Sequence, residues 1–559
     1  MMQRNKFKIG LLVSNHSLDY FSNELIHQLN ETCDIEVSII LSEGVYSHNN
    51  SSGSKILNFI KQNGLFRTIS VMSFKIQSKV ETFILKKTEK NFAKYGATFD
   101  VNSIDFITNK LNVKAHYSKS GYVVRYQEED LYNIKVLDLD LLLRINTPGI
   151  FKGEILHAAK HGLLSFHHGD NRWNRGGPPA FWEIYHKKPA TGFIIQILSE
   201  VLDAGKVVYR GEVPTLFFYE LNKFHLFKES YPSMALVIQR LIEQGNFDVE
   251  VPVSVSEKLY KIPNFWQLIN YQTYLFGNIS KKIIRRIFHR TGRWSVAYFI
   301  GEFGTKQFSE AVKITNPKSR FFADPFVTKF NNQTVLFVED YHYNTKKGVI
   351  TAIELKENSY HILGTVIEED FHLSYPFVFN YENQLYMIPE SYNSNSIRLY
   401  KCVDFPLKWE YQKDLLSDVA CTDSNVFEYD NRWWLFTNKN GGTKSNFNKL
   451  YIYYTDHPIT GEWKEHAQNP VVFQNSGRNG GFLPTKNNQL TRISQKHGFC
   501  MYGKSTVISN IKKLTPDIYE EEISQEISSG FFQNIKGTHH LSSNGEYTVF
   551  DYVKDEFVY

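Results

Sequence analysis

The sequence predicts an α/β domain with a Rossmann-like sheet, a helical linker region and an all-β propeller of five blades. Three observations lead to this prediction. The chain has 559 residues, too many for one ordinary domain. Apolar strands alternate with helical patterns up to about residue 215, and short strands recur beyond residue 310. We therefore expect domains at residues 1–215 and 311–559, joined by a helical linker at 216–310.

The first region alternates strand and helix patterns. We expect strands at residues 8–13, 35–41, 136–145 and 163–166, and helices at 18–29 and 153–159, with two more helical patterns between 56 and 111. This alternation predicts a parallel sheet with helices on both faces. Ligands in such folds bind at the carboxyl ends of the strands, and His167 falls at one of these ends.

The linker region contains two helical patterns, at residues 233–244 and 264–290. The second interleaves isoleucines with five basic residues, Lys281, Lys282, Arg285, Arg286 and Arg290. A basic amphipathic helix can lie on an anionic membrane surface. The alternative, which we favour on the general behaviour of amphipathic helices, is a linker helix whose apolar face packs between domains.

The C-terminal region contains a weak repeat of roughly 50 residues. Its strongest members are residues 323–327, 374–379 and 422–427, and weaker members are 478–482 and 537–541. Four short strands per repeat are typical of propeller blades. The polar residues of the first strand of each blade would then converge on the central channel.

Composition excludes several classes of protein. The net charge of +5 does not indicate a nucleic-acid binder. The four cysteines, Cys33, Cys402, Cys421 and Cys500, have neither zinc nor redox spacing, so we expect reduced thiols and no metal. No apolar run reaches about 18 residues, so we expect no membrane span. We expect a cytoplasmic protein with at most peripheral contact at the inner membrane face.

One stretch, residues 163–208, suggests chemistry. A short strand ends in His167, a Gly/Pro turn follows, and a second strand leads to Asp203 beside Gly205. An amine must lose a proton to attack an acyl carbon, and a neutral imidazole oriented by a carboxylate suits that task. Alternatively, His167 could be a buried structural histidine and Asp203 a turn-forming aspartate. The surrounding pattern favours a functional role for both residues.

That surrounding pattern resembles the formyltransferase family. His167, Arg175-Gly176, Pro179, Thr191-Gly192 and Leu202-Asp203-Ala204-Gly205 follow the order and register of the family. The resemblance extends over about residues 100–215. It implies N10-formyltetrahydrofolate as cosubstrate, His167 as base and Asp203 as its partner.

The chain departs from the family at Ser165, where the family has an asparagine two residues before the histidine. The family's asparagine donates a hydrogen bond to the formyl oxygen, where such a donor is worth roughly 3 kcal/mol. A serine hydroxyl is a shorter donor. Asn171 from the following loop, or the imidazolium of His167, could take its place.

The resemblance also implies where ligands bind. The folate would lie against two loops that include Arg144, Ile145, Asn146, Thr147, Leu198 and Val201. Arg172 and Arg175 could bind substrate phosphates, although Arg175 could equally be structural. Trp182 could pack under the site or stack on a sugar or base.

Known family members formylate initiator methionyl-tRNA, glycinamide ribonucleotide or amino sugars. No small basic C-terminal barrel is present, and the modest net charge argues against tRNA. Amino sugars remain, either nucleotide-linked or in a glycan intermediate, and we predict an N-formyltransferase of surface polysaccharide biosynthesis. A catalytically weak glycan-binding protein is one alternative.

The other alternative is a glycoside hydrolase acting through the propeller. Residues 372–377, 387–391 and 469–471 resemble the propeller found beside plant glucosamine inositolphosphorylceramide transferases. More distantly, the motif beginning at Asp324 resembles five-bladed arabinanase-type glycosidases. Hydrolysis needs paired carboxyls, for which Asp324, Glu390 and Asp423 are candidates, although aspartates also cap turns at blade starts.

Overall fold

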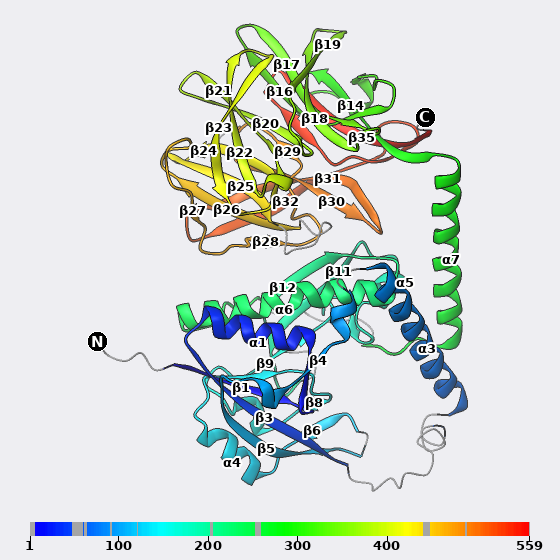
Figure 1. Cartoon of the computed structure of the whole chain (residues 1–559), viewed down its shortest axis with the longest axis vertical. Coiled ribbons are helices and arrows are strands. Elements are labelled where there is room, and N and C mark those ends of the chain that lie inside the picture. The colour runs from blue at the N-terminus through cyan, green and yellow to red at the C-terminus, as the bar shows by residue number, and fades with distance from the viewer. Residues whose placement is uncertain are drawn as a thin grey trace. The chain divides into compact units, whose positions relative to one another are not determined.

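The computed structural model describes residues 6–46, 60, 64–89, 92–119, 121–201, 205–251, 259–439, 448–486 and 489–557. The chain forms two compact units, Met1–Phe276 and Gly277–Tyr559, which are described separately (Figure 1). Helix α7 (Phe265–Ile287) runs through this boundary. Within the described residues, none of the helices is long and apolar enough to cross a bilayer.

The first unit is built on a nine-stranded sheet in the order β12-β11-β9-β7-β1-β3-β5-β6-β8. Its strands are β1 (Phe7–Val13), β3 (Ile35–Tyr46), β5 (Ile107–Tyr117), β6 (Val123–Arg125), β7 (Leu141–Arg144), β8 (Ile150–Phe151), β9 (Leu163–His167), β11 (Ala190–Ile197) and β12 (Lys206–Pro214). The five central strands, from β9 to β5, are parallel. β11 pairs antiparallel with β9 and β12, and β6 pairs antiparallel with β5, so the sheet is mixed, whereas a parallel sheet was predicted.

Strand order places a crevice at the carboxyl edge of this sheet. The chain builds outward from β1 through β3 to β5, then returns to the other side of β1 with β7 and β9. Neighbouring loops therefore leave β1 and β7 in opposite directions, which opens a space that ligands use in such folds. β9, which ends in His167, lies next to β7.

Helices cover the sheet. The unit contains α1 (Tyr20–Thr32), α3 (Leu65–Thr88), α4 (Glu128–Val136), α5 (Trp182–Tyr185) and α6 (Tyr219–Gln244), with 3₁₀ turns η1 (Phe92–Gly96), η2 (Val101–Ser103) and η3 (Glu154–His157). Short strands β2 (Ser17–Asp19), β4 (Thr98–Asp100), β10 (Arg175–Gly176) and β13 (Leu259–Tyr260) form two small ladders. α1 and α6 pack against each other, and α6 also contacts β11 and β12 (Figure 1).

Alternation along β9 assigns its side chains to two faces, because successive residues of a strand point in opposite directions. Leu163 packs in an apolar cluster with Ile134 of α4. Phe166 lies on the other face, against Tyr231 of α6, with ring centroids 4.6 Å apart. His167 therefore shares the face of Leu163, and His168 continues toward α6.

Several elements differ from the prediction. The strand expected at 136–145 is shorter, because α4 continues to Val136 and β7 begins at Leu141. The helical region expected between 56 and 111 includes the start of β5. α6 begins at Tyr219 and contains Pro232, so the helix expected at 233–244 is only its second half.

The second unit contains five sheets. The first sheet consists of β16 (Arg320–Phe330), β17 (Gln333–His342), β18 (Lys347–Leu355) and β19 (Tyr360–Ile367). The second consists of β20 (Ser374–Tyr381), β21 (Gln384–Glu390), β22 (Ser396–Asp404) and β23 (Lys408–Ser417). The third consists of β24 (Cys421–Tyr429), β25 (Arg432–Lys439), β26 (Lys449–Thr455), β27 (Lys464–Glu465) and β28 (Val472–Phe473). The fourth is β30 (Thr491–Gly498), β31 (Met501–Leu514) and β32 (Tyr519–Ser528). The fifth joins β14 (Arg290–Ile300) and β15 (Val312–Lys313) to β29 (Gly481–Phe482), β33 (Ile535–Gly537), β34 (Leu541–Ser543) and β35 (Tyr547–Phe557).

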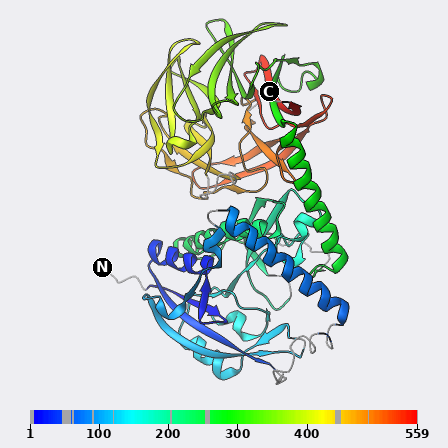
Figure 2. The ribbon, with the colours of Figure 1, turned by 45° about the vertical axis from the view of Figure 1, so that its right-hand side comes forward.

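The five-bladed propeller is thus confirmed, and its ring is closed by both ends of the unit (Figure 2). β14 pairs with β35 without a break from Arg290↔Phe557 to Ile300↔Tyr547. The residues expected to form a linker at 216–310 are divided between the units, because α6 packs on the first sheet and β14 completes the last blade.

The three strong repeats share a backbone feature. β16, β20 and β24 each shift register at the same place in the repeat, between Ala323 and Phe326, Ser374 and Phe377, and Thr422 and Asn425. Each bulge contains a residue with positive φ, namely Asp324, Tyr375 and Asp423. A bulge redirects the side chains that follow, so the repeat serves a geometric purpose.

Candidate functional site

A cleft of about 920 Å³ opens in the first unit at the carboxyl ends of β7 and β9. Its described lining includes side chains from β7, β8, β9 and β11, the first turn of α3 and residues 259–262. These are Arg67, Tyr122, Arg144, Ile150, Phe151, Phe166, His167, Gln196, Leu198, Val201, Leu259, Tyr260, Lys261 and Ile262, together with several glycines. The cleft therefore combines an apolar wall with one imidazole, one carboxamide and three cationic side chains.

His167 is half-buried in this cleft. Its Nε2 lies 3.1 Å from the backbone oxygen of Asn174. A carbonyl oxygen only accepts, so this contact requires the proton on Nε2 and leaves Nδ1 as the proton acceptor. Asn174 is itself buried, and its Nδ2 donates to Glu183 at 2.8 Å. Burial raises the pKa of Glu183 to about 7.

His168 occupies a different environment. Its Nε2 lies 3.1 Å from the Ser230 hydroxyl, and its ring packs against Phe166 and Phe227. Burial lowers the pKa of His168 to about 3. The ring is neutral at physiological pH and packs beneath α6.

Ser165 does not supply the carboxamide that the family has at this position. It is buried, and its hydroxyl donates to the Phe166 carbonyl at 3.1 Å. Directly across the ladder, however, β11 pairs Gln196 with Ser165. Gln196 lines the cleft, and its Oε1 is buried without a hydrogen-bond partner among the described residues.

Gly205 explains how Gln196 is held. A Cβ at this glycine would lie 2.7 Å from Gln196 Oε1 and 2.7 Å from the Ile197 oxygen. Any larger residue would collide with both, so the chain passes the Gln196 amide closely because residue 205 is glycine. The adjacent Asp203, with Leu202 and Ala204, lies outside the described residues.

Asn171 lies away from the cleft lining. Its Oδ1 accepts from Arg210 at 3.2 Å, and Arg210 also binds Asp170 at 2.6 Å. Arg172 pairs with the same aspartate and with Glu212 at 3.3 Å. Burial raises the pKa of Asp170, but hydrogen bonds and charge from the two arginines outweigh it and hold the pKa below its usual value. This cluster shapes the loop after β9.

The two predicted folate loops divide in the same way. Arg144, Leu198 and Val201 line the cleft. Ile145 is buried, and Thr147 donates to the Leu12 carbonyl at 2.8 Å, so both hold the loop in place. Asn146 donates to Asp19 and to Ser22.

Arg144 is a half-buried cation at the cleft wall. Its Nε donates to the Thr147 carbonyl at 2.7 Å, and its guanidinium lies over the Phe151 ring. Burial lowers the pKa of Arg144 to about 10. Among the other predicted substrate residues, Trp182 is buried and stacks on Tyr260, and Arg175 belongs to the β10–β13 ladder.

The sequence did not single out Arg67, Lys261 or Gln196. Arg67 comes from α3 and Lys261 follows β13, both far along the chain from His167. The two segments meet where Arg67 donates a hydrogen bond to the Ile262 carbonyl at 2.7 Å. No local pattern marks such residues. Gln196 carried a signal, because it interrupts the apolar strand Phe193–Ile195 with a carboxamide.

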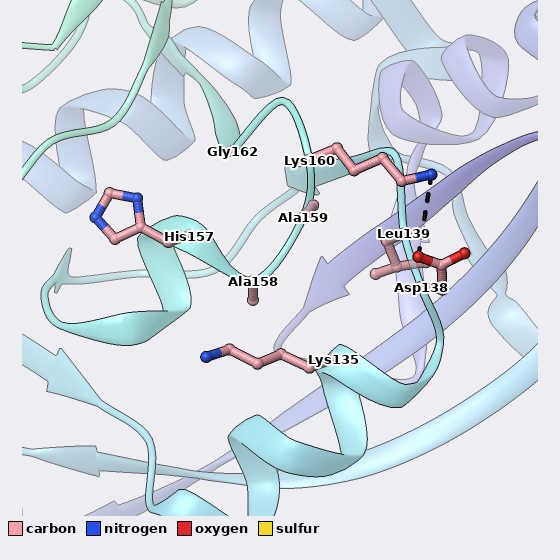
Figure 3. Close-up of a pocket in the computed structure, with 8 residues that line it drawn as sticks. All are labelled: Lys135, Asp138, Leu139, His157, Ala158, Ala159, Lys160 and Gly162. Atoms are coloured by element: carbon pink, nitrogen blue, oxygen red, sulfur yellow. Dashed lines mark ion pairs between the residues drawn. The ribbon is translucent and has the colours of Figure 1, made fainter.

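A second, smaller depression of about 400 Å³ lies at the opposite edge of the sheet (Figure 3). Leu139 and Gly162, which line it, precede β7 and β9. Figure 3 shows Lys160 paired with Asp138 here, and Lys160 also binds Asp140 at 2.8 Å. This depression lies at the amino ends of β7 and β9, whereas His167 lies at the carboxyl end of β9.

In the propeller, the predicted candidate Asp324 is a buried ion-pair partner. His539 lies 3.2 Å from Asp324 and 2.8 Å from Asp551. Burial lowers the pKa of His539, but the two carboxylates more than compensate and raise it to about 10. Ligand-type atoms of these three residues lie within 4.8 Å of one another, an arrangement also found in metal sites. The raised pKa keeps the ring protonated in the metal-free cluster.

The other two candidates, Glu390 and Asp423, meet at Arg478. Arg478 binds Asp423 through Nε and lies 3.6 Å from Glu390, and Gln495 donates to Asp423 at 3.0 Å. Burial and the charge of Asp423 raise the pKa of Glu390. The structure thus brings Glu390 and Asp423 together, and one guanidinium contacts both carboxyls.

Residues 291–548 match the family described as glucosamine inositolphosphorylceramide transferase 1, N-terminal. The match begins within β14 and ends within β35, and so covers the propeller. Glucosamine inositolphosphorylceramide transferase 1 of rice (Oryza sativa subsp. japonica) is 38% identical over 210 residues, which are 36% of this chain and 28% of the rice protein. The chain thus spans less than a third of the length of that relative.

The chain is also homologous to formyltransferases. Methionyl-tRNA formyltransferase of Bacillus cereus is 26% identical over 256 residues, covering 42% of this chain and 77% of that protein. Among solved structures, a sugar N-formyltransferase from a Shewanella species is 14% identical, covers 47% of this chain and 86% of its own, and has a TM-score of 0.27.

Proposed function

We propose that the protein is an N-formyltransferase that transfers a formyl group from N10-formyltetrahydrofolate to the amine of an amino sugar. The observation that carries this proposal is the cleft itself, in which His167 and Gln196, whose buried Oε1 has no hydrogen-bond partner among the described residues, lie at the strand ends of a chain homologous to formyltransferases. The cosubstrate would supply an activated one-carbon acyl group.

The cleft suits a folate in size and chemistry. Ligand pockets of about 300–1,000 Å³ are typical of small molecules, and this cleft falls within that range. Ile150, Phe151 and Leu198 offer an apolar wall to a flat ring. Arg67, Arg144 and Lys261 offer positive charge to carboxylates or phosphates, and no aspartate or glutamate occurs in the described lining.

His167 acts as the base in this proposal. Its Nε2 proton is held by the Asn174 carbonyl, so Nδ1 takes the proton of the attacking amine. Glu183 fixes Asn174 from behind and so positions the imidazole. Asp203, the carboxylate that the family resemblance implies, would stabilise the imidazolium through its charge, because both ring nitrogens are already engaged.

Gln196 takes the role left open by Ser165. Its amide faces the cleft on the same side of the sheet as His167, because it pairs with Ser165, two residues away on β9. With its carbonyl turned away, its Nε2 would donate a hydrogen bond to an acyl oxygen held beside His167. A preorganised donor at such a position stabilises developing negative charge.

An amino sugar is the acceptor that best fits the two halves of the chain. The relatives of the propeller are named for glucosamine, an amino sugar. We propose that the propeller recognises the acceptor or its glycan, and that the three cations of the cleft bind a nucleotide diphosphate when the sugar carries one. Because Arg478 and His539 neutralise Asp423 and Asp324, we assign the propeller to binding in preference to hydrolysis.

The first prediction tests the base. The full-length protein is incubated with N10-formyltetrahydrofolate and a panel of nucleotide-linked amino sugars, and N-formylated product is measured by mass spectrometry. His167→Gln should lower the turnover by 10²–10⁴-fold, the usual contribution of a general base. His157→Gln, on η3 in the second depression, is the matched control and should retain activity.

Turnover of His167→Gln at the wild-type rate would contradict the proposal. The turnover of Asp203→Asn should fall as much as that of His167→Gln if Asp203 assists His167 as in the family. The folded state of each variant is checked by circular dichroism, so that loss of the base is separated from loss of structure.

A further inference from the structure

Helix α3 exposes an apolar stripe of side chains to solvent. The residues are spaced three or four apart, which aligns them on one face of a helix, and they are Leu65, Ile69, Met72, Ile76, Val80 and Phe83. Phe83 is 61% exposed and Ile76 is 60% exposed. The neighbouring Phe66 is 86% exposed.

This stripe is separate from the face by which α3 packs. Phe74 and Leu85 are buried, and the Glu81 carboxylate accepts from the Tyr271 hydroxyl at 2.6 Å and the Glu220 amide at 2.9 Å. These residues lie on the opposite side of the helix from Ile76 and Phe83. The stripe is therefore additional apolar surface and not a poorly packed core.

The charges of α3 are almost entirely basic. Its basic residues are Arg67, Lys75, Lys79, Lys86 and Lys87, and its single acidic residue, Glu81, is buried. α7 has the same composition, with Lys281, Lys282, Arg285 and Arg286 and no acidic residue. It also exposes Trp266 and Phe276.

We propose that the apolar stripe of α3 docks on an anionic lipid bilayer. Contiguous exposed apolar surface of this kind marks an interaction site in soluble proteins. A helix with an apolar face and basic flanks lies in the interface of a membrane, where the apolar side chains enter the acyl boundary and the lysines meet acidic headgroups.

Charge decides between a bilayer and a second copy of the chain. Two α3 helices packed through this stripe would bring Lys75 and Lys79 of both copies together, which is unfavourable. An anionic surface instead complements them. The contact is peripheral, because no helix within the described residues meets the requirements for spanning a membrane.

Docking through α3 does not require formyl transfer. The docking helix and the cleft are nevertheless connected, because Arg67 in the first turn of α3 lines the cleft. Docking through α3 would hold the cleft beside the lipid headgroups.

The test is flotation of the full-length protein with vesicles of phosphatidylcholine alone and of phosphatidylcholine with 30% phosphatidylglycerol. We expect binding to the mixed vesicles at least 10-fold tighter than to the neutral ones, and weakened by high salt. Ile76→Asp with Phe83→Asp should reduce binding at least 10-fold. Lys75→Glu with Lys79→Glu should remove the preference for acidic lipid.

Ile523→Asp is the matched control, since Ile523 is similarly exposed but lies on β32 of the propeller. It should bind vesicles as the wild type does. Equal binding to both vesicle types, or no loss in Ile76→Asp with Phe83→Asp, would overturn the proposal. A third result would also overturn it. The wild type would be a dimer in sedimentation velocity and would not bind vesicles, and Ile76→Asp with Phe83→Asp would make it a monomer. Circular dichroism of each variant verifies that the fold is retained.

Discussion

At the scale of single residues, the direction of a side chain separates function from packing. His167 ends β9 and lines the cleft, whereas its neighbour His168, the residue after the strand, packs beneath α6. Pairing between β9 and β11 places Ser165 and Gln196 together on the cleft side. Our proposal is that the donor missing at Ser165 is supplied from the neighbouring strand by Gln196.

Gln196 gives the second prediction. Gln196→Leu keeps the size of the side chain but removes its donor, so kcat should fall about 100-fold with little change in the KM of the amine. Affinity for a non-transferable formyl-folate analogue, measured by calorimetry, should weaken as well. Gln28→Leu, at an exposed position of α1, should change neither.

The rescue variant makes this prediction specific. Adding Ser165→Asn to Gln196→Leu returns a carboxamide to the same space and should recover part of the lost kcat. An unchanged kcat in Gln196→Leu would show that another group donates the hydrogen bond. Loss of both activity and folate affinity in His167→Gln and Gln196→Leu alike would instead point to a collapsed cleft.

At the scale of elements, α3 is held by one buried carboxylate. Glu81 joins three helices, because it accepts from Tyr271 of α7, from the Glu220 amide of α6 and from Gln77 of α3 itself. Desolvation raises its pKa, and the three donors partly offset that effect. A polar anchor of this kind fixes the rotation of α3, and with it the orientation of the apolar stripe and of Arg67.

Glu81 gives the third of the mutational predictions. Glu81→Ala leaves the buried Glu220 amide without its acceptor, and the Tyr271 hydroxyl keeps only the more distant Phe217 carbonyl at 3.3 Å. These losses should lower the free energy of unfolding of the first unit by about 3 kcal/mol. Urea unfolding measures this loss, and hydrogen exchange of residues 65–88 localises it. Lys79→Ala, at an exposed position, should change the free energy by less than about 0.5 kcal/mol. Equal midpoints for the two variants would refute the anchoring role.

At the scale of the whole molecule, each unit is closed by contacts distant in sequence. The propeller ring depends on β14 pairing with β35, which joins residues 290–300 to residues 547–557. Its interior is an ionic cluster in which His539 and Asp324 shift each other's pKa in opposite directions, upward for His539 and downward for Asp324.

The cluster predicts how propeller stability depends on pH. The pKa of His539 is raised in the folded state to about 10, so its contribution is complete below its unfolded pKa of about 6.5 and is lost as pH rises toward 10. The pKa of Asp324 is lowered, so its contribution is present above about 3.8 and is lost as pH falls. The propeller should therefore be most stable between these limits.

Thermal unfolding of the propeller transition between pH 7 and pH 10 checks this expectation. The wild type should lose stability over that range more steeply than His539→Gln, which lacks the titrating group and should already be less stable at pH 7. Parallel pH profiles for the two proteins would show that His539 is not the group responsible.

Local patterns predicted much of this architecture. The strands β1, β3 and β9 and the helix α1 follow from apolar periodicity, and the bulges of β16, β20 and β24 occur at the repeats found in the sequence. Other elements resisted prediction. The antiparallel β11–β12 hairpin looks like any other apolar segment, and Pro232 lies within α6 although proline usually ends a helix.

The sequence by itself determined the two folds, the family resemblance and the position of His167 at a strand end, because these depend on short-range periodicity and on the spacing of a motif. Only the tertiary structure decided which side chains share the cleft. Arg67, Gln196 and Lys261 reach His167 from separate elements, and contacts between distant segments leave no local trace in a chain. The apolar stripe of α3 was decided in the same way, because a helical pattern shows that a face is apolar but not whether anything packs against it.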